Sequence, residues 1–261
     1  MTKVIINLEE LQKRQADENL VIIDLRDEEI YNQGHLAGAV NMVANEYFIG
    51  KETYLPNLDQ LGEALSEKGI SNTSEIILYD GGSFRQAARA YFVFNYLNHH
   101  KLSILDDEKI DYKLSTDIPV RKKAEYSIQP IESRAVGIDY IEEKLMDDSS
   151  MLIDSRSAER YLGVKEPKYK QAGHIPNARN YESKSVFTES GSWRSPEELK
   201  EHYKHLNEKE EVIVSCGSGG SACLNFVGLK VAGFENVKMY SGGFSEWIDN
   251  GKEIKNGKTK A

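Results

Sequence analysis

Cys216 is the residue in this sequence whose type and surroundings most clearly allow chemistry. It follows Glu211 to Ser215, a run that predicts a strand, and it precedes Gly217 to Ser221, which are all glycine or serine. The residues from Ala222 to Val231 predict a helix, with Gly233 just past its end as a C-cap. Backbone N–H groups of a glycine-rich loop and the N-terminus of a helix both stabilise negative charge. Such surroundings favour the ionised form of a thiol, so we predict that Cys216 is a reactive thiolate.

Two other roles for this segment have to be weighed. A small buried cysteine with only a packing role is the usual fate of a free Cys, but glycines and serines would pack poorly around it. A phosphatase with a related loop needs an arginine six residues after the cysteine to bind phosphate, and here that residue is Ala222. Phosphate chemistry is therefore not expected. The second cysteine, Cys223, lies on the predicted helix and is expected to pack in the core.

The segments that position Cys216 belong to a pattern that occurs twice. Each copy has an apolar run that ends in Asp-x-Arg, and later a Gly-His pair followed by Leu or Ile. These segments are Leu20 to Arg26 and Gly34 to Leu36 in the first copy, and Met151 to Arg156 and Gly173 to Ile175 in the second. A helix start, Ser195-Pro196-Glu197-Glu198, precedes the Cys216 strand in the second copy. The recurring order of strands and helices predicts an internal duplication of an α/β domain, each with a mainly parallel sheet flanked by helices.

The two copies differ at the end of one strand. Where the second copy has Cys216, the first has Asp80, followed by Gly81-Gly82-Ser83 and a predicted helix from Arg85 to Tyr96. A carboxylate at this place can cap the N-terminus of that helix. We therefore expect the first copy to be catalytically inactive and to keep only the scaffold.

A connector separates the two copies. Residues 114–135 are rich in charge and carry Pro119 and Pro130, which is typical of a linker. The sequence thus predicts an inactive domain over residues 1–113, a linker over 114–135 and a catalytic domain over 136–261.

Composition limits the partners of the protein. The chain has 261 residues with a formal net charge of −9 and a pI near 5.3, which argues against nucleic acid or an anionic membrane as the main partner. No apolar run approaches the roughly 18 residues of a membrane span, and the N-terminus lacks the apolar core of a signal peptide. Two cysteines form neither a disulfide framework nor a zinc motif. We expect a cytoplasmic protein.

These features together resemble the two-domain rhodanese sulfurtransferases, over nearly the whole chain. The motifs that carry the resemblance are the two Asp-x-Arg and Gly-His segments, the loop from Cys216 to Gly219 and the late motif from Ser241 to Trp247. Within that family the loop is similar to Cys-Gly-Ser-Gly-Val-Thr of the 3-mercaptopyruvate type, with Gly220-Ser221 in place of Val-Thr. Members that prefer thiosulfate usually carry Cys-Arg-Lys-Gly. The resemblance implies two tandem rhodanese-like domains.

The resemblance also implies a reaction. Cys216 would take sulfane sulfur from 3-mercaptopyruvate as a persulfide, release pyruvate, and pass the sulfur to cyanide or to a thiol, either a small thiol or a thioredoxin-like protein. No cofactor or metal is implied. One alternative is a thiosulfate:cyanide sulfurtransferase. Another, from a different class, is a persulfide carrier or redox-sensing module with little turnover of its own.

Family relationships point to the residues that would bind the donor. Arg160 is the implied ligand of the donor carboxylate, and Lys168 stands where the family has a second arginine, so it offers charge without the bidentate fork. A solvated surface charge is the alternative role for both side chains. The implied loop contacts are Gly217, Gly219, Gly220 and Ser221.

The family is also credited with a Ser-His-Asp set that moves a proton during transfer. It would correspond here to Ser218, His35 and Asp24. Both copies contain the Asp and the His, however, as Asp24 with His35 and Asp154 with His174. At least one of these pairs is therefore expected to tie loops together.

The remaining histidines suggest no further site. His202 and His205 are spaced three apart on one predicted helix without acidic or thiol partners nearby, so we expect a solvated helix face. His99 and His100 close a predicted helix of the first copy and are expected at the surface.

Overall fold

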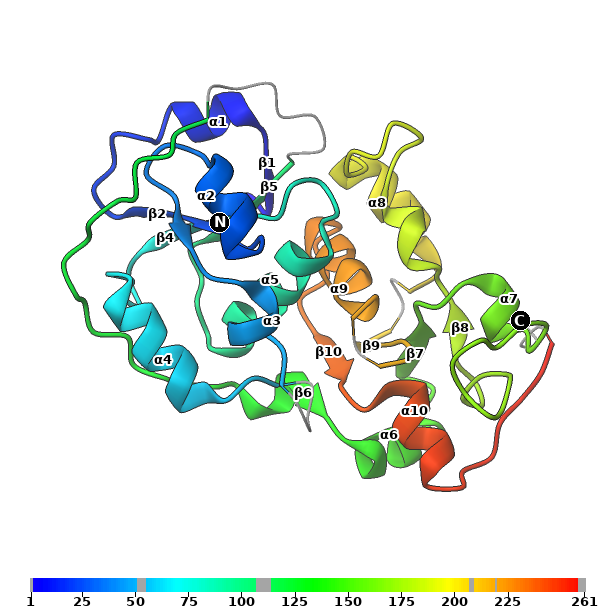
Figure 1. Cartoon of the computed structure of the whole chain (residues 1–261). Coiled ribbons are helices and arrows are strands. Elements are labelled where there is room, and N and C mark those ends of the chain that lie inside the picture. Colours follow the sequence, from blue (N-terminus) through cyan, green and yellow to red (C-terminus); the bar gives the residue numbers. More distant parts are fainter. Residues whose placement is uncertain (1, 51–54, 107–113, 207–208, 219, 258–261) are drawn as a thin grey trace. The chain divides into compact units, whose positions relative to one another are not determined.

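The computed structural model describes residues 2–50, 55–106, 114–206, 209–218 and 220–257. The chain forms two compact units, coloured along the chain in Figure 1. Unit 1 comprises residues 1–131 together with 189–193, and unit 2 comprises residues 132–188 together with 194–261. The predicted boundaries at residues 113 and 135 stay a prediction, although residues 114–131 of the predicted linker belong to unit 1.

Unit 1 is built on a parallel sheet in the order β1-β5-β4-β2-β3. Its strands are β1 (Ile5–Ile6), β2 (Leu20–Asp24), β3 (Val40–Asn41), β4 (Glu75–Tyr79) and β5 (Leu102–Leu105). Its helices are α1 (Leu8–Gln12), α2 (Glu28–Gln33), α3 (Ala44–Tyr47), α4 (Leu58–Glu67) and α5 (Arg85–Tyr96). The long helix α5 packs on β4 and β5. A parallel sheet buried on both faces needs strands that are apolar throughout, and every residue of β2 is buried.

Unit 2 repeats this arrangement with the order β6-β10-β9-β7-β8. Its strands are β6 (Ala135–Val136), β7 (Ser150–Asp154), β8 (Arg179–Asn180), β9 (Glu211–Ser215) and β10 (Val237–Tyr240). Its α-helices are α6 (Ile138–Lys144), α7 (Ala158–Tyr161), α8 (Pro196–His202), α9 (Ala222–Val231) and α10 (Gly243–Asp249), and its 3-10 helices are η1 (Glu132–Arg134), η2 (Ser183–Val186) and η3 (Lys204–Leu206). Strand for strand, the two orders are the same. The predicted duplication and α/β class are confirmed.

Local sequence signals set the ends of the helices that surround the site. Ser195 caps α8 by accepting the N–H of Glu198, whose side chain accepts the N–H of Ser195 in return. The predicted bounds of α5 and α9 are those observed. Gly233 follows α9 with φ of +94°, a left-handed conformation that favours glycine at this place.

Each of the two expectations about histidines holds for one residue and is wrong for the other: His100 and His205 are exposed, but His99 and His202 are not. His99 is 3% exposed, and its Nε2 lies 2.9 Å from the carbonyl oxygen of Ser74, because the turn after α5 folds back against the sheet. His202 is half-buried, with Nε2 2.9 Å from Oγ of Ser185. In both cases a partner distant in sequence covers a ring that the local pattern placed in solvent. Burial lowers the pKa of both imidazoles.

Two negative findings concern the described part of the chain. None of its helices is both long and apolar enough to cross a membrane. Within the same ranges, no three side chains of His, Cys, Asp or Glu are grouped so that they could hold a metal ion.

Candidate active site

Cys216 lies between β9 and α9, where it is 3% exposed. The backbone around it is held by the start of α10. The N–H of Phe244 donates to the carbonyl oxygen of Cys216 at 2.8 Å, and the N–H of Ser245 donates to that of Gly217 at 3.0 Å. These bonds use N–H groups of the first helical turn that have no partner within the helix. The backbone of the cysteine is therefore fixed at the carboxyl edge of a parallel sheet by the N-terminus of α10.

The late Ser-Gly-Gly-Phe motif is explained by this contact. Gly243 has φ of +60°, and a Cβ on it would lie 2.6 Å from the carbonyl oxygen of Cys216. A side chain there would push the two loops apart, so the close approach of α10 to the cysteine requires glycine. Phe244 and Trp247 pack in the core of unit 2, as the sequence predicts.

Asn225 of α9 ties the neighbouring loop to the same edge. Its Nδ2 donates to Oγ of Ser155 at 2.8 Å and to the carbonyl oxygen of Tyr181, and its Oδ1 accepts from Oη of Tyr203 at 2.6 Å. The N–H of Ser155 in turn donates to the carbonyl oxygen of Ser215. Asn225 is fully buried, and its role was not predicted, because a single Asn inside an apolar helix carries no local signal.

The cationic side of the site is a network of two arginines around one glutamate. Nε and Nη2 of Arg160 donate to the Glu166 carboxylate at 2.8–3.1 Å, and Nη1 of Arg156 lies 3.3 Å from Oε2. The Glu166 side chain is 2% exposed and that of Arg160 is 17% exposed. The guanidinium of Arg156 also pairs with Asp154 and stacks over the Phe244 ring at 3.9 Å. Arg160 is thus partly buried and oriented, not a freely solvated charge.

Arg160 and Gly217 are brought together by the fold. A Cβ built on Gly217 would lie 3.4 Å from Nη2 of Arg160 and 2.8 Å from Oη of Tyr169. The guanidinium therefore lies beside the residue that follows the cysteine. Neither Glu166 nor Tyr169 was predicted, since each is one polar residue in an irregular segment.

For the other predicted binding residues, the structure gives their exposure and few contacts. The Lys168 residue is exposed, and its N–H donates to Oε1 of Glu166 at 3.0 Å. Ser218 and Ser221 are half-buried, and Gly220 is exposed. Gly219 lies outside the described residues. Their contacts with a donor stay predictions.

Asp24 and His35 have partners that hold unit 1 together. The Asp24 carboxylate accepts from Nε and Nη2 of Arg26 and from Oη of Tyr79. His35 stacks on the Tyr31 ring with centroids 3.8 Å apart, and its Nδ1 and Nε2 lie 2.9 and 3.1 Å from the carbonyl oxygens of Tyr31 and Asp117. The ring of this buried histidine is thus oriented by backbone carbonyls and by stacking.

The same contacts recur around Asp154 and His174 in unit 2. Asp154 pairs with Arg156, and His174 stacks on Tyr161 at 3.9 Å with Nδ1 2.8 Å from the Tyr161 carbonyl oxygen. Arg26 and Arg156 each donate to the carbonyl of the glycine that precedes the histidine. Because both units share this arrangement, we infer that it serves the fold of each.

The loop of unit 1 that corresponds to the cysteine loop is filled by its own carboxylate. Asp80 accepts from Oγ of Ser83 and from the N–H groups of Phe84, Gln86 and Ala87, at 2.8–3.3 Å. The donors are those of a helix N-terminus, so the predicted capping role of Asp80 is confirmed.

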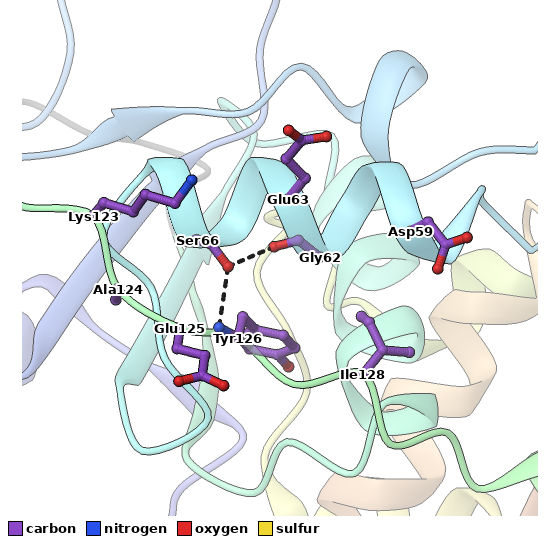
Figure 2. Close-up of a pocket in the computed structure, with 9 residues that line it drawn as sticks. All are labelled: Asp59, Gly62, Glu63, Ser66, Lys123, Ala124, Glu125, Tyr126 and Ile128. Atoms are coloured by element: carbon purple, nitrogen blue, oxygen red, sulfur yellow. Dashed lines mark hydrogen bonds between the residues drawn. The ribbon is translucent and has the colours of Figure 1, made fainter.

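A surface pocket of about 420 Å³ also lies in unit 1, between α4 and the segment from Lys123 to Ile128 (Figure 2). Oγ of Ser66 donates to the Gly62 carbonyl and accepts the Tyr126 N–H, which fixes the segment on the helix. Three carboxylates, Asp59, Glu63 and Glu125, line the pocket beside one lysine. An anionic sulfur donor would be repelled there, and the pocket contains none of the predicted site residues.

The rhodanese-like domain matches residues 7–108 and 138–250, one match in each unit. The chain therefore belongs to the rhodanese-like domain family, as its sequence motifs predict. Relatives include a Pseudomonas aeruginosa protein named "Probable 3-mercaptopyruvate sulfurtransferase", 26% identical over 94% of both chains. The rat thiosulfate sulfurtransferase is 29% identical over 76% of this chain and 70% of its own.

Solved structures agree on the fold. The Tum1 protein of Saccharomyces cerevisiae matches with a TM-score of 0.81 at 19% identity, covering 98% of this chain and 99% of that one. EanB in complex with hercynine matches with a TM-score of 0.79 at 22% identity over 91% of this chain. The chain spans 64% of the length of that EanB structure.

Proposed function

We propose that the protein is a sulfurtransferase that takes sulfane sulfur from 3-mercaptopyruvate onto Cys216 and passes it to a thiol or to cyanide. The observation that carries this proposal is the position of Arg160 beside Gly217, the residue that follows Cys216. A buried cysteine whose backbone is held by the N-terminus of α10 has, one residue away, an oriented guanidinium that can attract an anionic donor. The names of the relatives support the reaction class.

The chemistry balances without a cofactor. The Cys216 thiolate attacks the sulfur of mercaptopyruvate, an S–S bond forms, and the C–S bond breaks with its electron pair moving to carbon. The resulting enolate takes up the proton that the donor thiol carried, which yields pyruvate and a persulfide anion. A second thiol or cyanide then attacks the outer sulfur and regenerates the thiolate, so the cysteine works in two half-reactions. Loop N–H groups supply hydrogen bonds to the anionic sulfur in both.

The described residues of the loop favour mercaptopyruvate over thiosulfate. Gly217, Ser218, Gly220 and Ser221 carry no charge. Thiosulfate has its negative charge on the sulfonate that is bonded directly to the transferred sulfur, so it would gain from cations within the loop. Mercaptopyruvate carries its charge on a carboxylate at the far end of a three-carbon chain. The Arg160 guanidinium, on a neighbouring segment, suits that second distribution of charge.

The proton relay through Ser218, His35 and Asp24 stays a prediction. Ser218, two residues after the nucleophile, is the member of the set that lies in the cysteine loop. We propose Ser218 as the group that hands the proton to the enolate. For Asp24 and His35 we favour the role in the fold of unit 1 that their contacts explain.

The test is sulfur loading of Cys216 itself. After incubation with mercaptopyruvate, mass spectrometry of the Cys216 peptide should show one added sulfur atom, with pyruvate released in equal amount. Cys216→Ser should abolish both and leave the circular dichroism spectrum unchanged. Cys223→Ser is the matched control, because Cys223 is fully buried in α9 and should leave loading intact. Pyruvate release that survives in Cys216→Ser would rule the proposal out.

Thiosulfate is the second candidate donor, since relatives of similar identity carry that name. Comparing kcat/KM for pyruvate release from mercaptopyruvate with kcat/KM for thiocyanate formation from thiosulfate separates the two. A protein that turns over neither donor, but takes sulfur from a partner desulfurase, would instead be a persulfide carrier.

A further inference from the structure

The space beside Gly217 is occupied by a residue that has no assigned role. A Cβ on Gly217 would lie 2.8 Å from Oη and 3.3 Å from Cε2 of Tyr169. Gly217 does not have the positive φ that would itself require glycine. A side chain at position 217 would therefore meet Tyr169 and Arg160 first, although the backbone conformation does not require glycine. Tyr169 is the group that fills the space where that side chain would be.

Tyr169 is held in this position from two sides. Its ring meets the Phe244 ring edge-on with centroids 6.1 Å apart, and the Arg160 guanidinium lies 5.4 Å from the centre of the Tyr169 ring. Phe244 is the residue whose N–H holds the Cys216 carbonyl, and Arg160 is fixed by Glu166. The phenol is thus packed between the helix that fixes the nucleophile and the cation proposed to bind the donor.

We propose that Tyr169 is a specificity-determining residue of the donor site, which lies against Gly217 and offers its hydroxyl, beside Arg160, to the carboxylate of the donor. This inference rests on the proposed function in one respect, the identity of the donor. A phenol O–H and guanidinium N–H groups together suit a carboxylate, since both can donate hydrogen bonds to its oxygens.

The same arrangement has a consequence for charge in the loop. A long cationic side chain at position 217 would lie next to the nucleophile and would favour a donor with its charge close to the transferred sulfur. Such a side chain would meet the Tyr169 hydroxyl first and would displace the phenol from Arg160. Glycine at 217 and tyrosine at 169 therefore form a matched pair, although they are far apart in sequence.

The first experiment removes only the hydroxyl. Tyr169→Phe keeps the ring against Phe244, and we expect it to raise KM for mercaptopyruvate about tenfold with kcat changed less than twofold, because a hydrogen bond to a charged group is lost on binding. KM for thiosulfate should stay within a factor of about two. Tyr47→Phe, on α3 of unit 1, is the matched control for general effects. An unchanged KM for mercaptopyruvate in Tyr169→Phe would overturn the role of the hydroxyl.

The second experiment needs no sulfur donor. Iodoacetate and iodoacetamide both alkylate a thiolate with loss of iodide, and only the first carries a carboxylate. The ratio of their rates at the Cys216 peptide, measured by mass spectrometry, should fall about fivefold or more in Tyr169→Phe and further in Arg160→Ala. A protein that takes no sulfur from mercaptopyruvate, yet shows this fall, would refute the proposed donor and support the role of Tyr169. An unchanged ratio in both variants would refute the role of Tyr169.

A third measurement tests the matched pair. Gly217→Ala alone should slow iodoacetate alkylation as much as Tyr169→Phe does, since the new Cβ displaces the hydroxyl. In a Tyr169→Ala background, the same change at 217 should have little further effect, giving a clear coupling in the double-mutant cycle. Strictly additive effects would show that a side chain at position 217 does not act by displacing the Tyr169 hydroxyl.

Discussion

At the scale of single residues, the site depends on charges that are shared. Arg156 and Arg160 both contact Glu166, and Arg156 also binds Asp154, so two cations and two anions form one partly buried network. A guanidinium held by two of its nitrogens has a fixed direction, and here Nη2 of Arg160 points beside Gly217. A fixed direction suits Arg160 to the role that we propose for it, binding a small anion.

Substitution of Arg160 should weaken binding of the sulfur donor. We expect Arg160→Ala to raise KM for mercaptopyruvate at least about tenfold, equivalent to about 1.4 kcal/mol, because the donor loses its cation. Arg160→Lys should recover only part of this loss, since an ammonium cannot form the two-pronged contact. Steady-state kinetics of pyruvate release measures both variants. Equal KM values for Arg160→Ala and the unchanged protein would remove Arg160 from the site.

Glu166 should be a positioning residue, acting through Arg160. Glu166→Gln leaves two guanidinium groups without their shared anion, and we expect a loss of about 2 kcal/mol in the free energy of unfolding. We expect KM for the donor to rise as well, because Arg160 is no longer held. Urea unfolding and kinetics give the two readouts. Glu159→Gln, an exposed neighbour on α7, should change neither, and a similar loss in that control would contradict the assignment.

At the scale of elements, the same strand–loop–helix motif has a different content in each of the two units. In unit 2 the loop after β9 leaves a thiol at the helix N-terminus, whereas in unit 1 the loop after β4 is closed by the Asp80 carboxylate. The N–H groups that Asp80 binds in unit 1 are of the same kind as those that would favour an anion in the cysteine loop of unit 2. An internal carboxylate satisfies them, which gives a physical reason for the predicted inactivity of unit 1.

Asp80 should therefore contribute to the stability of unit 1. We expect Asp80→Ala to lower the free energy of unfolding by about 2 kcal/mol, because three backbone N–H groups lose a charged acceptor. Ser83→Ala removes only one of the bonds to this carboxylate and should cost about 0.5–1 kcal/mol. Urea denaturation followed by circular dichroism compares them. A larger loss in Ser83→Ala than in Asp80→Ala would show that the carboxylate does not organise the loop.

At the scale of the whole molecule, buried imidazoles link stability to pH. Burial lowers the pKa of His99, His174 and His202 below 6.5. As the pH falls through 6.5, the unfolded chain binds protons at these rings that the folded chain does not, so the folded state is destabilised. We expect the free energy of unfolding to be highest above pH 7 and to fall between pH 7 and 5. The measurement is urea unfolding across that range.

The control for this pH dependence is His99→Gln, which keeps a polar side chain without a titrating ring. The fall in stability between pH 7 and 5 should be smaller in this variant. A steeper fall in His99→Gln than in the unchanged protein would contradict the link to burial of the imidazole.

The fold could be predicted from the sequence, and Cys216 proposed as the nucleophile, because both signals are local. Apolar runs, helix caps and the repeated Asp-x-Arg and Gly-His segments lie within a few residues of the structures that they specify, so the duplication, both α/β units and the capping role of Asp80 were predictable. Cys216 was recognisable for the same reason, since the strand before it and the loop and helix after it are contiguous.

The groups around the Cys216 loop were decided by tertiary structure. Glu166 takes up the guanidinium of Arg160, and Tyr169 reaches Gly217 across almost fifty positions of sequence. Burial of His99 depends in the same way on Ser74. No local pattern marks such contacts, because they exist only when parallel strands bring the loops at one edge of a sheet together. The sequence by itself therefore determined the duplicated fold and pointed to Cys216 as the proposed nucleophile, and the folded chain decided which groups surround it.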